Sequence, residues 1–107
     1  MSRPWEKNWD DIGALAKGGQ GITRLVRRKT DPSTTGVLKY LLNNRNASAR
    51  ARMSREVANL NSLSPLGARI PKVLEHNTES FLDHSSELYL IMEYISARII
   101  HAKIFKR

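Results

Sequence analysis

One stretch of the chain has the apolar spacing of an α-helix, and this stretch constrains the fold more than any other feature. Between residues 46 and 63, apolar side chains recur every three or four positions: Ala49, Met53, Val57, Leu60 and Leu63. This spacing places them on one face of a helix. Asn46 or Ser48 can cap its start, and the sequence Ser-Pro-Leu-Gly at 64–67 ends it. We therefore expect a single helix within a chain of otherwise shorter elements.

The rest of the chain is divided into short apolar segments by turn-forming residues. Glycine, proline and small polar residues gather in four places: 17–21, 30–36, 64–67 and 76–87. Such clusters are typical of loops. The segments between them are predicted to be strands: 9–16, 22–28, 36–42, 69–74 and 88–95. The first two strands are expected to form a hairpin, and the third is expected to be buried on both faces. The predicted fold class is α+β, a five-stranded antiparallel sheet with one helix.

Length and composition exclude several classes of protein. A chain of 107 residues is one domain at most. The absence of cysteine excludes a disulfide framework, a thiolate metal site and a thiol nucleophile. The three histidines lie far apart in the sequence, which argues against a metal site. Because we find neither a signal-like N-terminus nor an apolar segment of the ~20 residues that span a membrane, we expect a cytoplasmic protein without membrane attachment.

The chain is strongly basic, which raises the question of a polyanionic partner. It has 18 Lys and Arg against 10 Asp and Glu, a net charge of +8, and such a charge attracts polyanions whatever the fold. Four arginines near the helix start are spread around its axis and indicate a solvated surface rather than a groove-reading face: Arg45, Arg50, Arg52 and Arg55. One hypothesis is therefore a non-enzymatic basic module that binds nucleic acid or an acidic protein, although the arginine spacing argues against nucleic acid.

The loop between the first two strands has the composition of a phosphate-binding backbone. Three glycines in the four residues 18–21 remove the β-carbons that keep a main chain away from a ligand. A flexible hairpin tip is the alternative. A P-loop is excluded because Gly19 and Gln20 follow Gly18 where Lys and Ser/Thr are required. The dinucleotide-binding fingerprint is excluded because Arg24 stands where it requires glycine.

Two charged residues on the next two elements can complete a phosphate site. Lys39 lies in the middle of the apolar strand 36–42, and Glu56 lies on the helix between Met53 and Leu60. A lysine that holds a phosphate needs its charge kept in place, and a carboxylate from a neighbouring helix does this. The alternative for Glu56 is a local pair with Arg52, four residues earlier.

Together with the segment LYLIMEYI at 88–95, these features resemble the N-terminal lobe of eukaryotic-type Ser/Thr protein kinases, over residues 9–95. In that family the glycine loop covers the phosphates of ATP, the strand lysine contacts the α- and β-phosphates, and the helix glutamate holds the lysine. The resemblance assigns the last two roles to Lys39 and Glu56. It assigns the loop role to five residues: Lys17, Gly18, Gly19, Gln20 and Gly21.

The resemblance also implies an adenine site. Three side chains would roof the adenine ring: Leu15, Thr23 and Val37. Met92 would guard the back of the pocket, and the backbone of Glu93 and Ile95 would bind the adenine edge. Ala16 stands where the family has its first glycine, and Thr23 stands where valine is usual.

The resemblance does not extend to the catalytic lobe. That lobe carries the His-Arg-Asp, Asn and Asp-Phe-Gly segments that supply the base and the Mg²⁺ ligands, and none of them occurs in the 107 residues. Residues 96–107 form a divergent basic and apolar tail without a carboxylate. We therefore expect no kinase activity from this polypeptide alone, weak or partner-dependent ATP binding, and Mg²⁺ only through the missing C-terminal lobe.

Three biological roles fit such a chain: half of a split kinase, a regulator, or a gene remnant. The expected partner is a second polypeptide that supplies the C-terminal lobe. The alternative is self-association through the cleft face that a missing lobe would leave exposed, because a large exposed apolar patch usually marks an interface.

Overall fold

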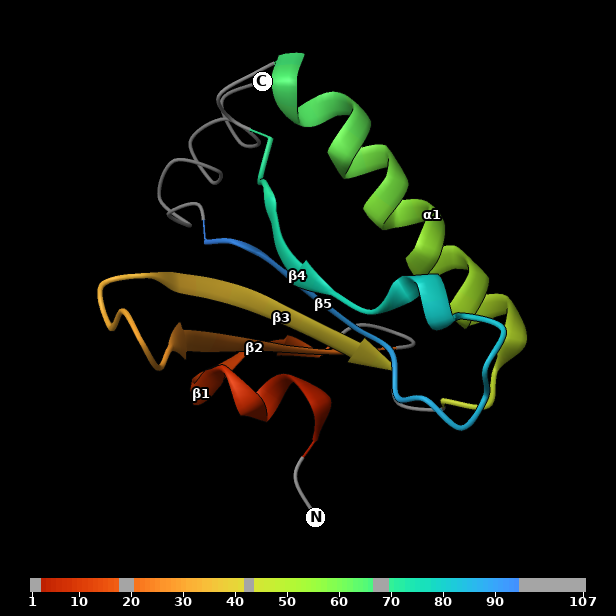
Figure 1. The fold of residues 1–107 in the computed structure, drawn as a ribbon, viewed down its shortest axis with the longest axis horizontal. Coiled ribbons are helices and arrows are strands. Elements are labelled where there is room, and N and C mark those ends of the chain that lie inside the picture. Colours follow the sequence, from red (N-terminus) through yellow and green to blue (C-terminus); the bar gives the residue numbers. More distant parts are fainter. Residues whose placement is uncertain (1–2, 18–20, 42–43, 67–69, 95–107) are drawn as a thin grey trace.

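A computed structural model describes residues 3–17, 21–41, 44–66 and 70–94, and within them the chain has an α+β fold (Figure 1). A five-stranded antiparallel open sheet carries one α-helix. The elements in chain order are η1 (Pro4–Lys7), β1 (Trp9–Lys17), β2 (Gly21–Arg28), β3 (Thr35–Leu41), α1 (Ala47–Leu63), η2 (Ser64–Leu66), β4 (Val73–His76), η3 (Thr78–Ser80) and β5 (Tyr89–Glu93), where η denotes a short 3₁₀ helix. The predicted fold class and the predicted order of three strands, a helix and two strands are confirmed.

The sheet has the strand order β1-β2-β3-β5-β4, so that the last strand of the chain lies between β3 and β4. The strands β1 and β2 form the predicted antiparallel hairpin. In the ladder, Thr23 of β2 lies opposite Lys39 of β3, and Lys39 lies opposite Leu90 of β5. Residues directly opposite each other in an antiparallel ladder project to the same face. These three side chains therefore share one face of the sheet.

The helix α1 begins and packs largely as its sequence predicts. The backbone N–H of Ala49 donates to Asn46 Oδ1 at 2.9 Å, so Asn46 rather than Ser48 caps the helix. Met53 and Val57 are buried, whereas Leu63, the last member of the apolar series, is 47% exposed. No helix in the described parts of the chain is long and apolar enough to cross a membrane.

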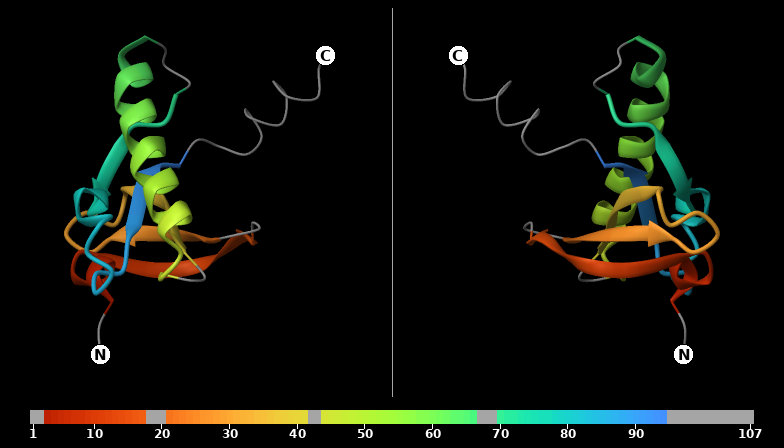
Figure 2. Two further views of the ribbon diagram at one scale, coloured as in Figure 1. Left: turned by 90° about the vertical axis from the view of Figure 1, so that its right-hand side faces the viewer. Right: turned by 90° about the vertical axis from the view of Figure 1, so that its left-hand side faces the viewer.

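Different parts of the chain pack on the two faces of the sheet and cover each of them in part. Figures 1 and 2 show α1 over one face and the N-terminal turn η1 on the other. On the helix side, the buried cluster consists of Met53, Val57, Leu88 and Leu90. On the opposite side, it consists of Trp5, Trp9, Val26, Leu38, Tyr89 and Ile91. Successive residues of β5 thus contribute to the two clusters in alternation, as the period of a strand requires.

Two predicted strand boundaries and one predicted strand environment differ in the structure. The strand predicted at 69–74 is described as β4 over Val73–His76, because Pro71 lacks the N–H that a ladder needs while Glu75 and His76 pair with β5; Arg69 lies outside the described residues. The strand predicted at 88–95 is described only over Tyr89–Glu93, and Ile95 lies outside the described residues. The strand β3 is not buried on both faces: in it only Gly36 and Leu38 are buried, while the remaining residues are partly exposed.

On the sheet face that η1 covers, the partly buried carboxylate of Glu75 accepts hydrogen bonds from two aromatic side chains. Glu75 Oε2 accepts a hydrogen bond from the Tyr89 hydroxyl at 2.7 Å, and Oε1 accepts one from Trp9 Nε1 at 3.1 Å. Burial raises the pKa of Tyr89 far above its ordinary value, and the hydrogen bond to Glu75 raises it further. Tyr89 therefore stays neutral in the folded protein at a pH at which it ionises in the unfolded chain.

This difference predicts a loss of stability at alkaline pH that depends on Tyr89. A group whose pKa is raised by folding contributes its full stability below the unfolded pKa, about 10 for tyrosine, and loses it as the pH rises toward the folded pKa. We expect the free energy of unfolding of the wild type to fall more steeply above pH ~10 than that of Tyr89→Phe. Urea denaturation followed by circular dichroism at several alkaline pH values measures both slopes, and identical slopes would contradict the prediction.

Candidate functional site

An ion pair between Lys39 and Glu56 connects the sheet to the helix. Lys39 Nζ lies 2.7 Å from Glu56 Oε2. The two side chains are 35% and 37% exposed, so both charges remain within reach of a ligand in solution. Arg52, the alternative partner, instead donates a long hydrogen bond of 3.4 Å to Ser48 Oγ. The predicted contact between Lys39 and Glu56 is therefore confirmed.

The apolar packing of α1 brings Glu56 to Lys39. Met53 and Val57 pack with Leu90, which is the residue of β5 directly opposite Lys39. Glu56 immediately precedes Val57 and follows Met53 by three positions, so it lies beside the buried stripe of the helix. The helix thus covers β5 with its apolar face and presents Glu56 to β3.

The glycine loop joins β1 and β2, and β3 is the next strand in the sheet. The loop residues Gly18, Gly19 and Gln20 lie outside the described residues. Its ends are Lys17, which closes β1, and Gly21, which begins β2 opposite Leu41. Neighbouring strands are about 4.8 Å apart. The loop therefore starts one strand away from β3, two residues along from the position of Lys39.

Of the residues predicted to surround an adenine ring, three lie on the same sheet face as Lys39. Val37 lies opposite Met92, and both share the sheet face of Lys39. Thr23 is on the same face, and Met92 packs against the helix-side cluster. Leu15, in β1, is 42% exposed. The sheet thus groups Thr23, Val37 and Met92 with Lys39 on one face.

The backbone N–H of Glu93, a residue predicted to bind the adenine edge, already forms a hydrogen bond within the protein. Its N–H donates to the carbonyl oxygen of Lys72 at 2.8 Å, and its carboxylate accepts from the Lys72 N–H at 3.0 Å. A contact of Glu93 with the adenine edge would therefore have to use the carbonyl oxygen. Ile95, the other residue predicted there, lies outside the described residues.

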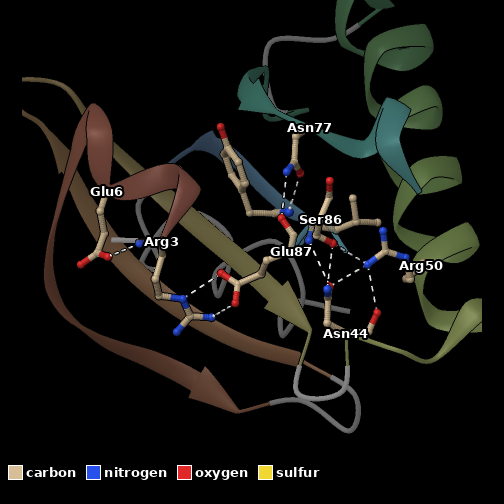
Figure 3. Close-up of polar contacts among 9 residues, drawn as sticks. Arg3, Glu6, Asn44, Arg50, Asn77, Ser86 and Glu87 are labelled. Carbon is tan, nitrogen blue, oxygen red and sulfur yellow. Dashed lines mark hydrogen bonds and ion pairs between the residues drawn. The ribbon is translucent and has the colours of Figure 1, made fainter. Parts of the chain in front are cut away.

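Arg50 is completely buried. The prediction that it belongs to a solvated arginine surface is therefore wrong. Arg50 lies three residues before Met53 and seven before Val57, on the same helical stripe, and this spacing is the signal that could have revealed its burial. Figure 3 shows its guanidinium pointing from α1 toward Asn44 and Ser86. Its hydrogen-bond acceptors are the carbonyl oxygens of Asn44, Ser80, Phe81, Asp83 and Ser86 and the side-chain Oδ1 of Asn44.

These contacts satisfy a buried charge without a carboxylate. A buried guanidinium is costly unless its donors are paired, and here carbonyl dipoles from the β4–β5 connection do this. The connection is also held by its own side chains: Asp83 accepts hydrogen bonds from Ser85 Oγ and Ser86 Oγ.

Among the residues that the structure describes, no group of three His, Cys, Asp or Glu side chains could hold a metal ion.

Comparison with known proteins gives no family assignment. No protein-family model matches the chain, and no curated protein matches it either.

Proposed function

We propose that residues 9–95 hold the phosphates of ATP as the N-terminal lobe of a Ser/Thr protein kinase-like protein. Lys39 would contact the α- and β-phosphates, and Glu56 would fix the direction of the Lys39 ammonium. The observation that carries the proposal is the 2.7 Å ion pair between strand and helix, next to the hairpin that bears the glycine loop. The order of these three features along the chain supports the same function.

The donors in this region suit a polyphosphate. An ammonium group has three N–H donors, so Lys39 can bond Glu56 with one and phosphate oxygens with the others. Backbone amides of a glycine-rich loop add further donors without side-chain obstruction. Phosphoryl transfer also needs a base and metal ligands, and the 107 residues contain none of the motifs that supply them. The proposed partner is therefore a polypeptide segment that carries this second set of residues.

The alternative of a general basic module is less well supported, because several of its cations are paired. Arg3 forms an ion pair with Glu87, Arg24 forms one with Asp11, and Arg50 is buried.

We also propose a cytoplasmic location, since a chain without cysteine needs no oxidising compartment.

We expect ATP to bind the chain weakly, with a dissociation constant above the micromolar range, because the 107 residues supply only one wall of a two-lobed site. In an NMR titration of the ¹⁵N-labelled chain, the largest shift changes should fall on the amides of 17–21 and near Lys39. Lys39→Ala should remove these changes, since it deletes the phosphate ligand. The matched control is Lys29→Ala, which deletes a 45% exposed lysine just beyond the other end of β2. That variant should bind ATP like the wild type.

Two results would overturn the proposal. The first is equal weakening by Lys39→Ala and Lys29→Ala together with a steep salt dependence, which would indicate general polyanion binding. The second is the absence of any nucleotide-dependent change at millimolar ATP. A low-micromolar dissociation constant by calorimetry would instead contradict the expectation that binding is weak without a partner.

A further inference from the structure

We propose that Arg50 is a positioning residue for the Lys39–Glu56 pair. By tying the start of α1 to the β4–β5 connection, it determines where along the sheet Glu56 meets Lys39. The relevance of this to nucleotide binding rests on the proposed function, but the positioning itself concerns the free protein.

The Arg50 contacts join segments that are distant in the sequence. Its Nε donates a hydrogen bond to the carbonyl oxygen of Phe81 at 2.8 Å, and its Nη1 donates one to the carbonyl oxygen of Ser86 at 2.7 Å. These acceptors lie 31 and 36 residues further along the chain. A planar guanidinium presents its donors in a fixed fork, so that several acceptors at once determine its position and its orientation. Arg50 therefore fixes both the location and the rotation of the first turns of α1.

The apolar contacts of the helix cannot do this alone. Met53 and Val57 press α1 against Leu88 and Leu90, but the hydrophobic effect has no directional preference. A small slide or rotation of α1 would keep most of this burial. Glu56 follows Arg50 by six residues, about 9 Å along the helix axis, and as part of the same rigid element it moves with Arg50. A displacement of Glu56 along the sheet therefore lowers the fraction of time for which its carboxylate stays at the 2.7 Å contact with Lys39.

Asn44 ties the same anchor to the strand beside Lys39. Its Oδ1 accepts from Arg50 Nη1 at 2.8 Å and also from the backbone N–H of Leu88 at 3.1 Å, and its Nδ2 donates to the Ser86 carbonyl at 2.8 Å. Leu88 lies two residues before Leu90, which is opposite Lys39. The anchor thus connects the helix that carries Glu56 with the strand that pairs with Lys39 (Figure 3).

A carbodiimide cross-linking experiment tests this without a nucleotide. The reagent joins a carboxylate to a neighbouring amine, and mass spectrometry of the digested protein quantifies the Lys39–Glu56 product. The pair of Lys29 and Asp10, 3.9 Å apart, is the internal reference, because Asp10 lies in β1 and Lys29 lies just beyond the end of β2, away from α1. The measured quantity is the ratio of the two products. The variant is Arg50→Gln, and the matched control is Arg52→Gln, which changes an exposed arginine two residues away.

We expect the ratio to fall severalfold in Arg50→Gln and to stay at the wild-type value in Arg52→Gln. An unchanged ratio in folded Arg50→Gln would overturn the proposal. A general loss of structure would lower both products together, and circular dichroism would show it. If Arg50→Gln unfolds, the Asn44→Ala variant tests the proposal instead. It removes the Asn44 side chain but leaves the carbonyl contacts of Arg50 in place, so a fall of the ratio below the wild-type value, smaller than a severalfold one, supports the proposal.

An unchanged ratio in Asn44→Ala, or unfolding of both variants, would overturn it, because Arg50 would then hold the domain as a whole rather than the position of the helix. Failure of the wild type to bind ATP would refute the proposed function and leave the cross-linking result intact.

Discussion

Replacement of Arg50 by methionine is expected to lower the free energy of unfolding by about 3–5 kcal/mol, because it removes six hydrogen bonds from a charged donor, each worth about 1.5–3 kcal/mol before the local structure relaxes. Methionine has a comparable length and fills the space, but it donates no hydrogen bond. The carbonyl oxygens of Ser80, Asp83 and Ser86 each keep one further N–H donor, so the loss falls mainly on the acceptors that depend on the guanidinium. Each buried acceptor that loses its partner costs about 1–3 kcal/mol, less whatever local rearrangement regains. For a domain with a typical stability of about 5–15 kcal/mol, this loss is a large fraction.

Urea denaturation followed by circular dichroism measures this effect. Arg52→Met is the matched control, because it makes the same change on the exposed side of α1, and we expect it to shift the free energy of unfolding by no more than about 0.5 kcal/mol. A loss below about 1 kcal/mol in Arg50→Met would mean that water replaces the missing donors through local opening of the connection.

The second large effect is expected on the other side of the sheet. Trp9→Ala should lower the free energy of unfolding by about 3–5 kcal/mol, the usual cost of removing a buried aromatic side chain. Trp9 is 1% exposed and packs in the cluster that contains Trp5 and Leu38. Its Nε1 donates to Glu75 at 3.1 Å, and the guanidinium of Arg28 lies 4.8 Å from its ring centroid. The substitution removes all of these contacts and leaves a cavity.

Leu82→Ala is the control for this experiment, because it truncates a large apolar side chain that is 78% exposed. We expect a change within about 0.5 kcal/mol, measured by the same denaturation experiment. Trp9→Phe should lose less than Trp9→Ala, since it keeps most of the buried apolar area. Equal losses in the two Trp9 variants would mean that the hydrogen bond to Glu75, rather than packing, accounts for the contribution of Trp9.

The order of the elements was predictable because its signals are local: the spacing of Met53 and Val57, for example, defines a helix within its own sequence. The Lys39–Glu56 contact spans 17 residues and was predicted from the order of glycine loop, lysine and glutamate, since a lysine that holds a phosphate needs a carboxylate beside it. The boundaries of β4 were less accessible, because Pro71 delays the start of pairing and only β5 determines how far the pairing extends.

The burial of Arg50 was not predicted, since arginine usually indicates solvent and its acceptors come from a polar loop 30 to 36 residues away. The role of the N-terminal residues was missed for the same reason. Residues 3–8 precede the predicted domain, yet Trp5 is buried and Arg3 bonds to Glu87, 84 residues later. Such contacts depend on the tertiary fold, and no pattern within the segment itself reveals them.

The alternating contribution of β5 to two clusters has a practical optical consequence. Both tryptophans of the chain, Trp5 and Trp9, lie in the cluster on the face away from Lys39. Intrinsic fluorescence will therefore report the opening of that face during unfolding, and a ligand bound beside Lys39 has no tryptophan within its own surroundings to quench. A change in emission upon ligand addition would mean that the ligand perturbs β5 and that Ile91 and Tyr89 transmit the perturbation through the sheet.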